Sequence, residues 1–113
     1  MFIYLSGPMS GIPDYNFPAF DAAAADLEAR GHIVFNPAQN DRDNGFDFTG
    51  LKGHEAKDHG FDIRTALKQD LSWICDYADG LATLPGWEVS KGALAEFHLA
   101  RALGIKIDTV EGF

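Results

Sequence analysis

Two acidic residues are candidates for chemistry, and one of them, Glu96, stands in surroundings where a carboxylate is unusual. Glu96 follows the small and apolar stretch Gly92-Ala93-Leu94-Ala95 and precedes Phe97. Burial of a carboxylate there would cost free energy, so a buried Glu96 would indicate a functional role. Asp70 lies in the sequence Leu67-Lys68-Gln69-Asp70-Leu71, on an expected helix. Taken alone, either residue could be an exposed acid on a helix surface. Two carboxyl groups at one cleft could instead share the roles of nucleophile and proton donor at a sugar carbon.

A turn made of small residues, and the start of the helix that carries Glu96, are further features that could bind a ligand. Ser6-Gly7-Pro8-Met9-Ser10-Gly11 follows an apolar run, and its small side chains would let a ligand approach the backbone. The turn matches neither the G-x-G-x-x-G dinucleotide fingerprint nor the G-x-x-x-x-G-K-[ST] P-loop. Ser90 precedes the helix that carries Glu96 and is a good N-cap residue. The N-terminus of that helix could also hold a phosphate, since backbone N–H groups and the helix dipole favour anions there.

Alternating strands and helices must position these residues. Apolar runs predict strands at 2–5, 32–35, 81–84 and 105–110, and apolar residues at helical spacing predict helices at 17–27, 61–74 and 91–103. This order predicts an α/β protein with an open parallel sheet and helices on both faces. Ligands bind beyond the carboxyl ends of the strands in such sheets, which here means the segments after Leu5, Phe35 and Leu84.

The connecting segments give weaker signals. Asn16 is expected to cap the helix that begins near Phe17. Residues 38–61 carry many Asp, Gly and Lys without a clean period, which predicts a long surface loop, with a helical turn as an open alternative. A loop of that length in a compact domain is often functional or mobile. Two histidines in that segment, His54 and His59, lack the spacing of a zinc-binding H-E-x-x-H motif, so a metal site is not favoured there.

Composition excludes several classes of function. The 113 residues fit one domain, expected to span 1–113, and the net charge of −8 with nine Lys and Arg argues against binding to a nucleic acid polymer. The single cysteine, Cys75, allows no intramolecular disulfide and is expected to pack as a small apolar residue on a helix. No signal peptide and no apolar run of about 20 residues is found, so we expect a cytoplasmic protein with no membrane partner.

Several short motifs resemble the nucleoside 2-deoxyribosyltransferase family when they are taken in order. They are Tyr4-Leu5-Ser6-Gly7-Pro8, Asp70-Leu71-x-Trp73, Ala78-Asp79 before a strand, Ser90-x-Gly92-x-x-x-Glu96, Ala100 and Gly104-Ile105. That family includes 2′-deoxynucleoside 5′-monophosphate N-glycosidases and small phage and bacterial members. The resemblance covers residues 2–37 and 66–107, whereas the middle segment does not align.

The resemblance implies a fold, a mechanism and a set of site residues. The fold would be a flavodoxin-like three-layer arrangement with a small parallel sheet of about four strands. Glu96 would attack C1′ of the sugar, Asp70 would assist departure of the base, and Tyr4 would orient the Glu96 carboxylate. No metal or organic cofactor would be needed. The expected substrate-binding residues are Ser6, Gly7, Ser10, Gly11, Gly86, Trp87, Ser90 and Gly92.

Ser90 bears on the choice of substrate within that family. Members that use nucleosides tend to carry an Asp six residues before the nucleophile, where it holds the 5′-hydroxyl, and members that use monophosphates tend to carry a Ser. The resemblance therefore favours hydrolysis of a 2′-deoxynucleoside 5′-monophosphate. Base exchange on free nucleosides and a non-catalytic nucleotide-binding module remain alternatives. Family members usually assemble with sites near subunit interfaces, so a homo-oligomer is expected.

Overall fold

A four-stranded parallel sheet forms the centre of the computed structural model, which describes residues 1–113. Its strands are β1 (Phe2–Ser6), β2 (Ile33–Phe35), β3 (Gly80–Thr83) and β4 (Lys106–Thr109), in the order β2-β1-β3-β4. β1 and β3 are central, and their side chains are buried on both faces from Ile3 onward and from Gly80 onward, as continuous apolar strands of parallel sheets usually are. The carboxyl ends of β1 and β3 therefore lie next to each other.

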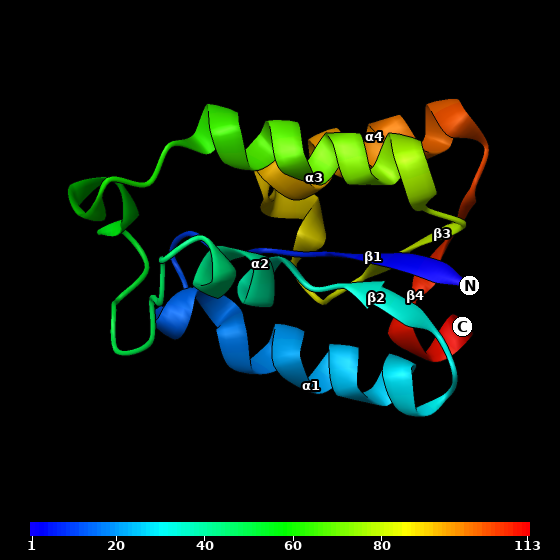
Figure 1. Cartoon of the computed structure of the whole chain (residues 1–113), viewed down its shortest axis with the longest axis horizontal. Helices are drawn as coiled ribbons and strands as arrows, with labels where there is room; N and C mark the ends of the chain where they lie inside the picture. The colour runs from blue at the N-terminus through cyan, green and yellow to red at the C-terminus, as the bar shows by residue number, and fades with distance from the viewer.

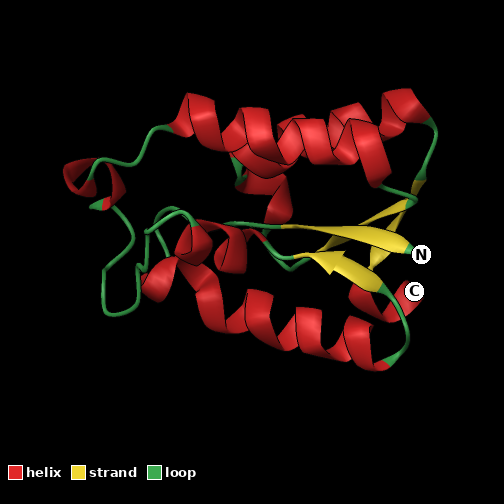
Figure 2. Ribbon diagram, viewed as in Figure 1, coloured by secondary structure: helices red, strands yellow, loops and turns green.

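Helices cover both faces of the sheet (Figures 1 and 2). α1 (Phe17–Ala29) lies on one face, and α3 (Ile63–Tyr77) and α4 (Lys91–Leu103) lie side by side on the other, while the short α2 (Pro37–Asp43) follows β2. This arrangement confirms the predicted α/β class and the flavodoxin-like three-layer fold. The α1 face holds the larger apolar core, and Tyr4, Ile74, Leu81 and Ala100 form a smaller one beneath α3 and α4.

The start of α1 differs from the prediction. Asn16 has a left-handed backbone (φ 60°) and makes no side-chain cap bond; its amide instead donates a hydrogen bond of 2.9 Å to the carbonyl oxygen of Pro8. Asp14 and Tyr15 just before it also have positive φ, a conformation that non-glycine residues rarely adopt. This strained turn fixes the segment after β1 against the beginning of α1.

The middle segment is more ordered than a surface loop. It begins inside α2 and contains a short 3-10 helix at Ala56–His59. Phe48 is only 2% exposed, and its ring packs on the rings of Tyr15 and Phe17, with centroids 4.6 and 5.8 Å apart. The prediction of a long surface loop was therefore wrong for this part of the chain, because aromatic side chains within a polar stretch anchor it to the core.

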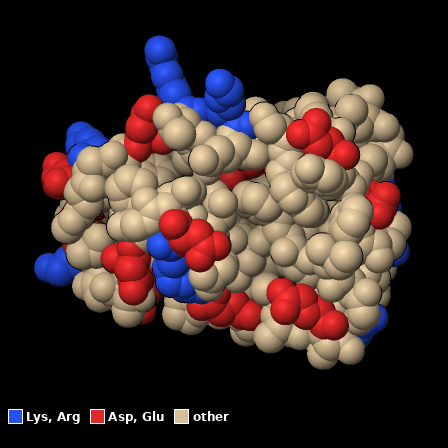
Figure 3. Space-filling view, viewed as in Figure 1, with Lys and Arg blue, Asp and Glu red and all other residues tan.

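Three further observations concern surface charge, the single cysteine and the length of the helices. Acidic side chains are scattered over the face seen in Figure 3, and Lys and Arg form no continuous patch there. Cys75, expected to pack as a small apolar residue, is exposed on α3. None of the helices has both the length and the apolar character needed to cross a membrane.

Candidate active site

Glu96 is a buried carboxyl group held by two hydroxyl groups. It lies on the side of α4 that faces the sheet and is 6% exposed. The Tyr4 hydroxyl donates to Oε2 and the Ser6 hydroxyl donates to Oε1, each at 2.7 Å. Tyr4 and Ser6 are two residues apart on β1, so strand geometry directs both side chains to the same face of the sheet. Both oxygens of Glu96 are thereby fixed in position.

Asp70 provides a second carboxyl group near Glu96. It lies on α3, which packs beside α4, close enough for its charge to raise the pKa of both Tyr4 and Glu96. Burial raises the pKa of Asp70 to about 6, although the Tyr4 hydroxyl favours the ionised form. Burial, and then the negative charge of Asp70, raise the pKa of Glu96 to about 8 against the opposing hydrogen bonds from Tyr4 and Ser6. The two groups therefore titrate as a coupled pair.

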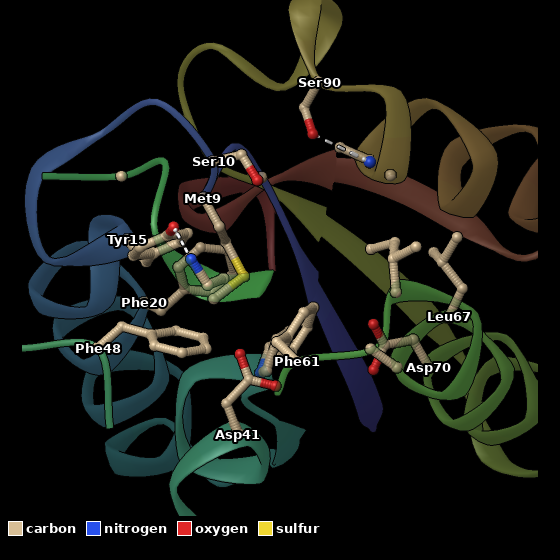
Figure 4. Close-up of a pocket in the computed structure, with 18 of the residues that line it drawn as sticks. Met9, Ser10, Tyr15, Phe20, Asp41, Phe48, Phe61, Leu67, Asp70 and Ser90 are labelled. Atoms are coloured by element: carbon tan, nitrogen blue, oxygen red, sulfur yellow. Dashed lines mark hydrogen bonds between the residues drawn. The ribbon is translucent and has the colours of Figure 1, made fainter. Parts of the chain in front are cut away.

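A cavity of about 740 Å³ opens onto this pair at the carboxyl end of the sheet. Its walls come from the turn after β1, from α1, α2, α3 and the first turn of α4, and from the middle segment. Figure 4 shows Ser10 and Ser90 at one side of the cavity and Asp41 at the other, with Phe61 between Asp41 and Asp70. One side is thus polar and lies near a helix N-terminus, whereas the other combines aromatic rings with a carboxyl group.

Ser90 begins α4 at the polar side of the cavity. Its hydroxyl oxygen accepts a hydrogen bond of 3.2 Å from the Ala93 N–H, which is the N-cap interaction expected from the sequence. The hydroxyl proton has no acceptor in the structure and is free to donate into the cavity. Gly92, in the first turn, also lines the cavity and has no atom near the position that a Cβ would occupy. N–H groups in a first helical turn lack intrahelical partners, so this end can bind an anion.

The turn after β1 is shaped by packing as well as by the cavity. Gly7, Ser10 and Gly11, which the family resemblance assigns to substrate binding, line the cavity. A Cβ on Gly7 would lie 2.7 Å from the Cβ of Leu84, so glycine is required there by the close approach of the segment after β3. Ser6 is not part of the cavity wall and reaches the site through Glu96.

The middle segment forms one wall of the cavity, which the sequence did not indicate. Phe48, Phe61, His54 and Lys57 all line it. The segment is held by the Tyr15 hydroxyl, which accepts a hydrogen bond of 2.7 Å from the Ala56 N–H. The aromatic residues in this otherwise polar stretch were the one signal in the sequence that could have shown its role.

Asp41 is the second contribution that sequence reasoning missed. It lies on α2, it is 8% exposed, and it lines the cavity. Burial, and then the charge of Asp70, raise its pKa to about 7, partly opposed by Arg42. No pattern in the polar sequence around Asp41 separates it from its exposed neighbours, and only the packing of α2 against α1 buries it.

Gly86 and Trp87 lie away from this cavity, contrary to their predicted role in binding substrate. The Trp87 ring packs in a tilted orientation on Phe97 of α4, with a centroid distance of 4.6 Å, and Trp87 borders a separate hollow lined by α1 and the segments after β3 and β4. Gly86 occupies a left-handed position (φ 88°) in the turn before it. Arg42, which follows Asp41 on α2, pairs with Asp21 at 2.7 Å.

Comparison with known proteins assigns the chain to a family. A family model described as "Domain of unknown function (DUF4406)" matches residues 1–109. The chain belongs to the DUF4406 family. The match includes every residue of the cavity, the middle segment among them, so the whole candidate site lies inside the family domain. No curated protein and no solved structure matches the chain. The family description names no activity.

Proposed function

We propose that this protein cleaves the N-glycosidic bond of a 2′-deoxynucleoside 5′-monophosphate by way of a covalent bond between Glu96 and the sugar. The observation that carries the proposal is the buried Glu96 carboxyl, held by two hydroxyl donors beside Asp70 at the edge of a large cavity. A carboxylate nucleophile and a nearby acid are the groups that glycoside cleavage requires. The resemblance to nucleoside 2-deoxyribosyltransferases supports the same assignment.

The reaction needs one proton on the carboxyl pair. Because each charge raises the energy of the other, the pair holds a single proton over an interval around neutral pH. In the free protein, the pKa of about 8 for Glu96 and of about 6 for Asp70 place this proton on Glu96, so the first step requires that it move to Asp70 when substrate binds. The hydrogen bonds from the Tyr4 and Ser6 hydroxyl groups then stabilise ionised Glu96. The Tyr4 hydroxyl donates to Glu96, and in the proposed reaction it can accept a hydrogen bond from Asp70 once that group is protonated.

The proposed chemistry has two steps. In the first, a Glu96 oxygen bonds to C1′ as the C1′–N bond breaks, and Asp70 gives its proton to the departing base nitrogen. In the second, water attacks C1′, the bond between C1′ and Glu96 breaks, and ionised Asp70 takes a proton from the water. The products are the free base and the sugar phosphate, and both carboxyl groups return to their starting state.

The direct test is to measure, by chromatography, the release of base from a panel of 2′-deoxynucleosides and their 5′-monophosphates. Each substrate is assayed alone and with a second free base present. Release from a monophosphate without an added base supports hydrolysis, whereas formation of a new nucleoside only when a second base is present would replace it with base exchange. Tight binding of a monophosphate without any product would instead indicate a binding module.

Ser90 is expected to decide between monophosphate and nucleoside. Loss of one hydrogen bond to a charged group reduces kcat/KM by roughly 10- to 150-fold, so Ser90→Ala should reduce activity on the monophosphate by that factor and on the nucleoside much less. Ser90→Asp keeps an N-cap acceptor but repels phosphate, and it should reverse the preference. The measurement is kcat/KM on a matched nucleoside and monophosphate. Equal effects on both substrates would leave Ser90 as a helix cap only.

Apolar side chains on the α3 and α4 layer support assembly. Ile63, Tyr77 and Leu103 are 58, 56 and 46% exposed, and Ile63 also stands at the rim of the cavity. A second copy packed there would remove apolar surface from water and help close the site. We expect at least a dimer in light scattering at micromolar concentration. Detection of monomer alone at micromolar concentration would refute the proposal that the protein assembles.

A further inference from the structure

Asp41 is a buried carboxyl group that the proposed reaction does not use. It is 8% exposed, no side chain or backbone N–H donates to its carboxyl oxygens, and it borders the cavity. No fully buried side-chain oxygen in the structure lacks a hydrogen-bond partner, so the unpaired oxygens of Asp41 are those that reach the open space of the cavity. Its neighbour Arg42 is engaged with Asp21 and Gln39. The carboxyl oxygens of Asp41 are therefore available to accept hydrogen bonds from a ligand in the cavity.

The position of Asp41 indicates which part of the substrate it would meet. Figure 4 places Ser10 and Ser90, the candidate phosphate ligands, at the opposite side of the cavity from Asp41. Asp70 on α3 and Glu96 on α4 line the same cavity, so a nucleotide with its phosphate at Ser90 and its sugar at Glu96 can extend its base toward Asp41. Phe48 and Phe61 flank Asp41 there, and their rings offer the apolar surface that a planar base needs.

We propose that Asp41 binds the exocyclic amino group of the substrate base, so that the protein selects bases that carry an amino group over bases that carry an oxo group at that position. This inference rests on the proposed function and specifies its substrate class: nucleotides of adenine and cytosine are preferred to those of hypoxanthine and uracil. An ionised carboxylate only accepts hydrogen bonds, so it pairs with an amino group and repels an oxo group.

The state of Asp41 sets the conditions for the test. Its pKa is raised to about 7 by burial and then by the charge of Asp70, while Arg42 acts in the opposite direction. At pH 8 most of the group is ionised and is an acceptor only. A protonated carboxyl could also donate to an oxo group, so discrimination is expected to be sharper at pH 8 than at pH 6.

The experiment compares pairs of 2′-deoxynucleoside 5′-monophosphates that differ only in the amino or oxo group: adenine against hypoxanthine, and cytosine against uracil. We expect wild-type kcat/KM at pH 8 to favour the amino member of at least one pair by about 10-fold or more. Asp41→Ala should lower activity on that amino member by roughly 10- to 100-fold and on the oxo member much less. Asp41→Asn carries both a donor and an acceptor, so it should shift the preference toward the oxo member.

Asp43→Asn is the matched control, since Asp43 lies on the same short helix, is exposed and accepts from Gln39 at 2.8 Å. It should leave the preference unchanged. Equilibrium binding of the same pairs to Glu96→Gln protein gives a second readout that needs no turnover. Release that depends on Glu96 but shows no amino preference, or the same preference in the Asp41 variants, would overturn the role of Asp41 alone. No Glu96-dependent release from any substrate would instead overturn the proposed function, and the binding series would then decide the role of Asp41 by itself.

Discussion

Replacement of Glu96 by Gln is expected to lower the rate of base release on the order of 10⁴-fold or more, as when other enzymes lose a nucleophile that forms a covalent intermediate. Gln has nearly the same shape and can still accept from Tyr4 or Ser6, so the cavity should keep its form. What it lacks is the negative charge that bonds to C1′. The measurement is single-turnover release of base from a monophosphate, with Glu88→Gln, an exposed acid just before α4, as the control.

The Tm of Glu96→Gln shows whether a loss of activity in this variant comes from lost chemistry or from unfolding. Burial raises the pKa of Glu96 from 4.5 to about 8, so the folded protein holds this proton more tightly than the unfolded chain does. The contribution of Glu96 to stability is therefore fully present below about pH 4.5 and is lost as pH rises toward 8. Glu96→Gln has no such titration, and its Tm at pH 8 should equal or exceed that of wild type. A folded variant with unchanged turnover would exclude a covalent role for Glu96.

Replacement of Asp70 by Asn is expected to reduce turnover by about 10²-fold or more, since Asn cannot give a proton to the departing base. Burial raises the pKa of Asp70 to about 6, which keeps its proton to a higher pH than an exposed Asp would. Wild-type activity should fall as pH rises and the pair loses its last proton. In Asp70→Asn that alkaline decline should disappear, leaving a low rate governed by ionisation of Glu96.

A comparison of two leaving bases separates proton transfer by Asp70 from a structural role. A structural role would reduce activity equally on both substrates, whereas proton transfer would not. A 7-methylguanine base departs without protonation because it already carries a positive charge, so its nucleotide should lose far less activity in Asp70→Asn than an ordinary purine nucleotide. Asp76→Asn, an exposed acid on the same helix, should behave as wild type on both. An equal loss on the two substrates would remove Asp70 from proton transfer.

The sequence predicted the fold well because the signals were local and repeated. Continuous apolar runs identified β1 and β3, which are buried on both faces, and helical spacing identified α1, α3 and α4. Parallel topology then follows from alternation, and it brings the ends of β1 and β3 together. Glu96 and Tyr4 were found because an acid among small residues stands out and the spacing matched a known pattern.

The parts that the sequence did not predict depend on contacts between distant segments. Phe48 and Asp41 lie in polar surroundings along the chain, and only their packing against α1 and the cavity shows that they are buried. Trp87 was assigned to substrate binding from its place after β3, yet its ring turns to Phe97 instead. Asn16 was expected to cap α1, but a strained turn directs its amide to Pro8.

The most direct measurement is to trap the bond between Glu96 and the sugar. Fluorine at C2′ withdraws electrons and slows both steps, so a 2′-fluoroarabino nucleoside 5′-monophosphate with a good leaving base should accumulate the glycosyl-enzyme. Mass spectrometry of the intact protein, followed by peptide mapping, is expected to find one sugar phosphate per chain, attached to the peptide that contains Glu96 and absent in Glu96→Gln. Release of base with no adduct, together with inversion at C1′ in the product, would contradict the covalent mechanism.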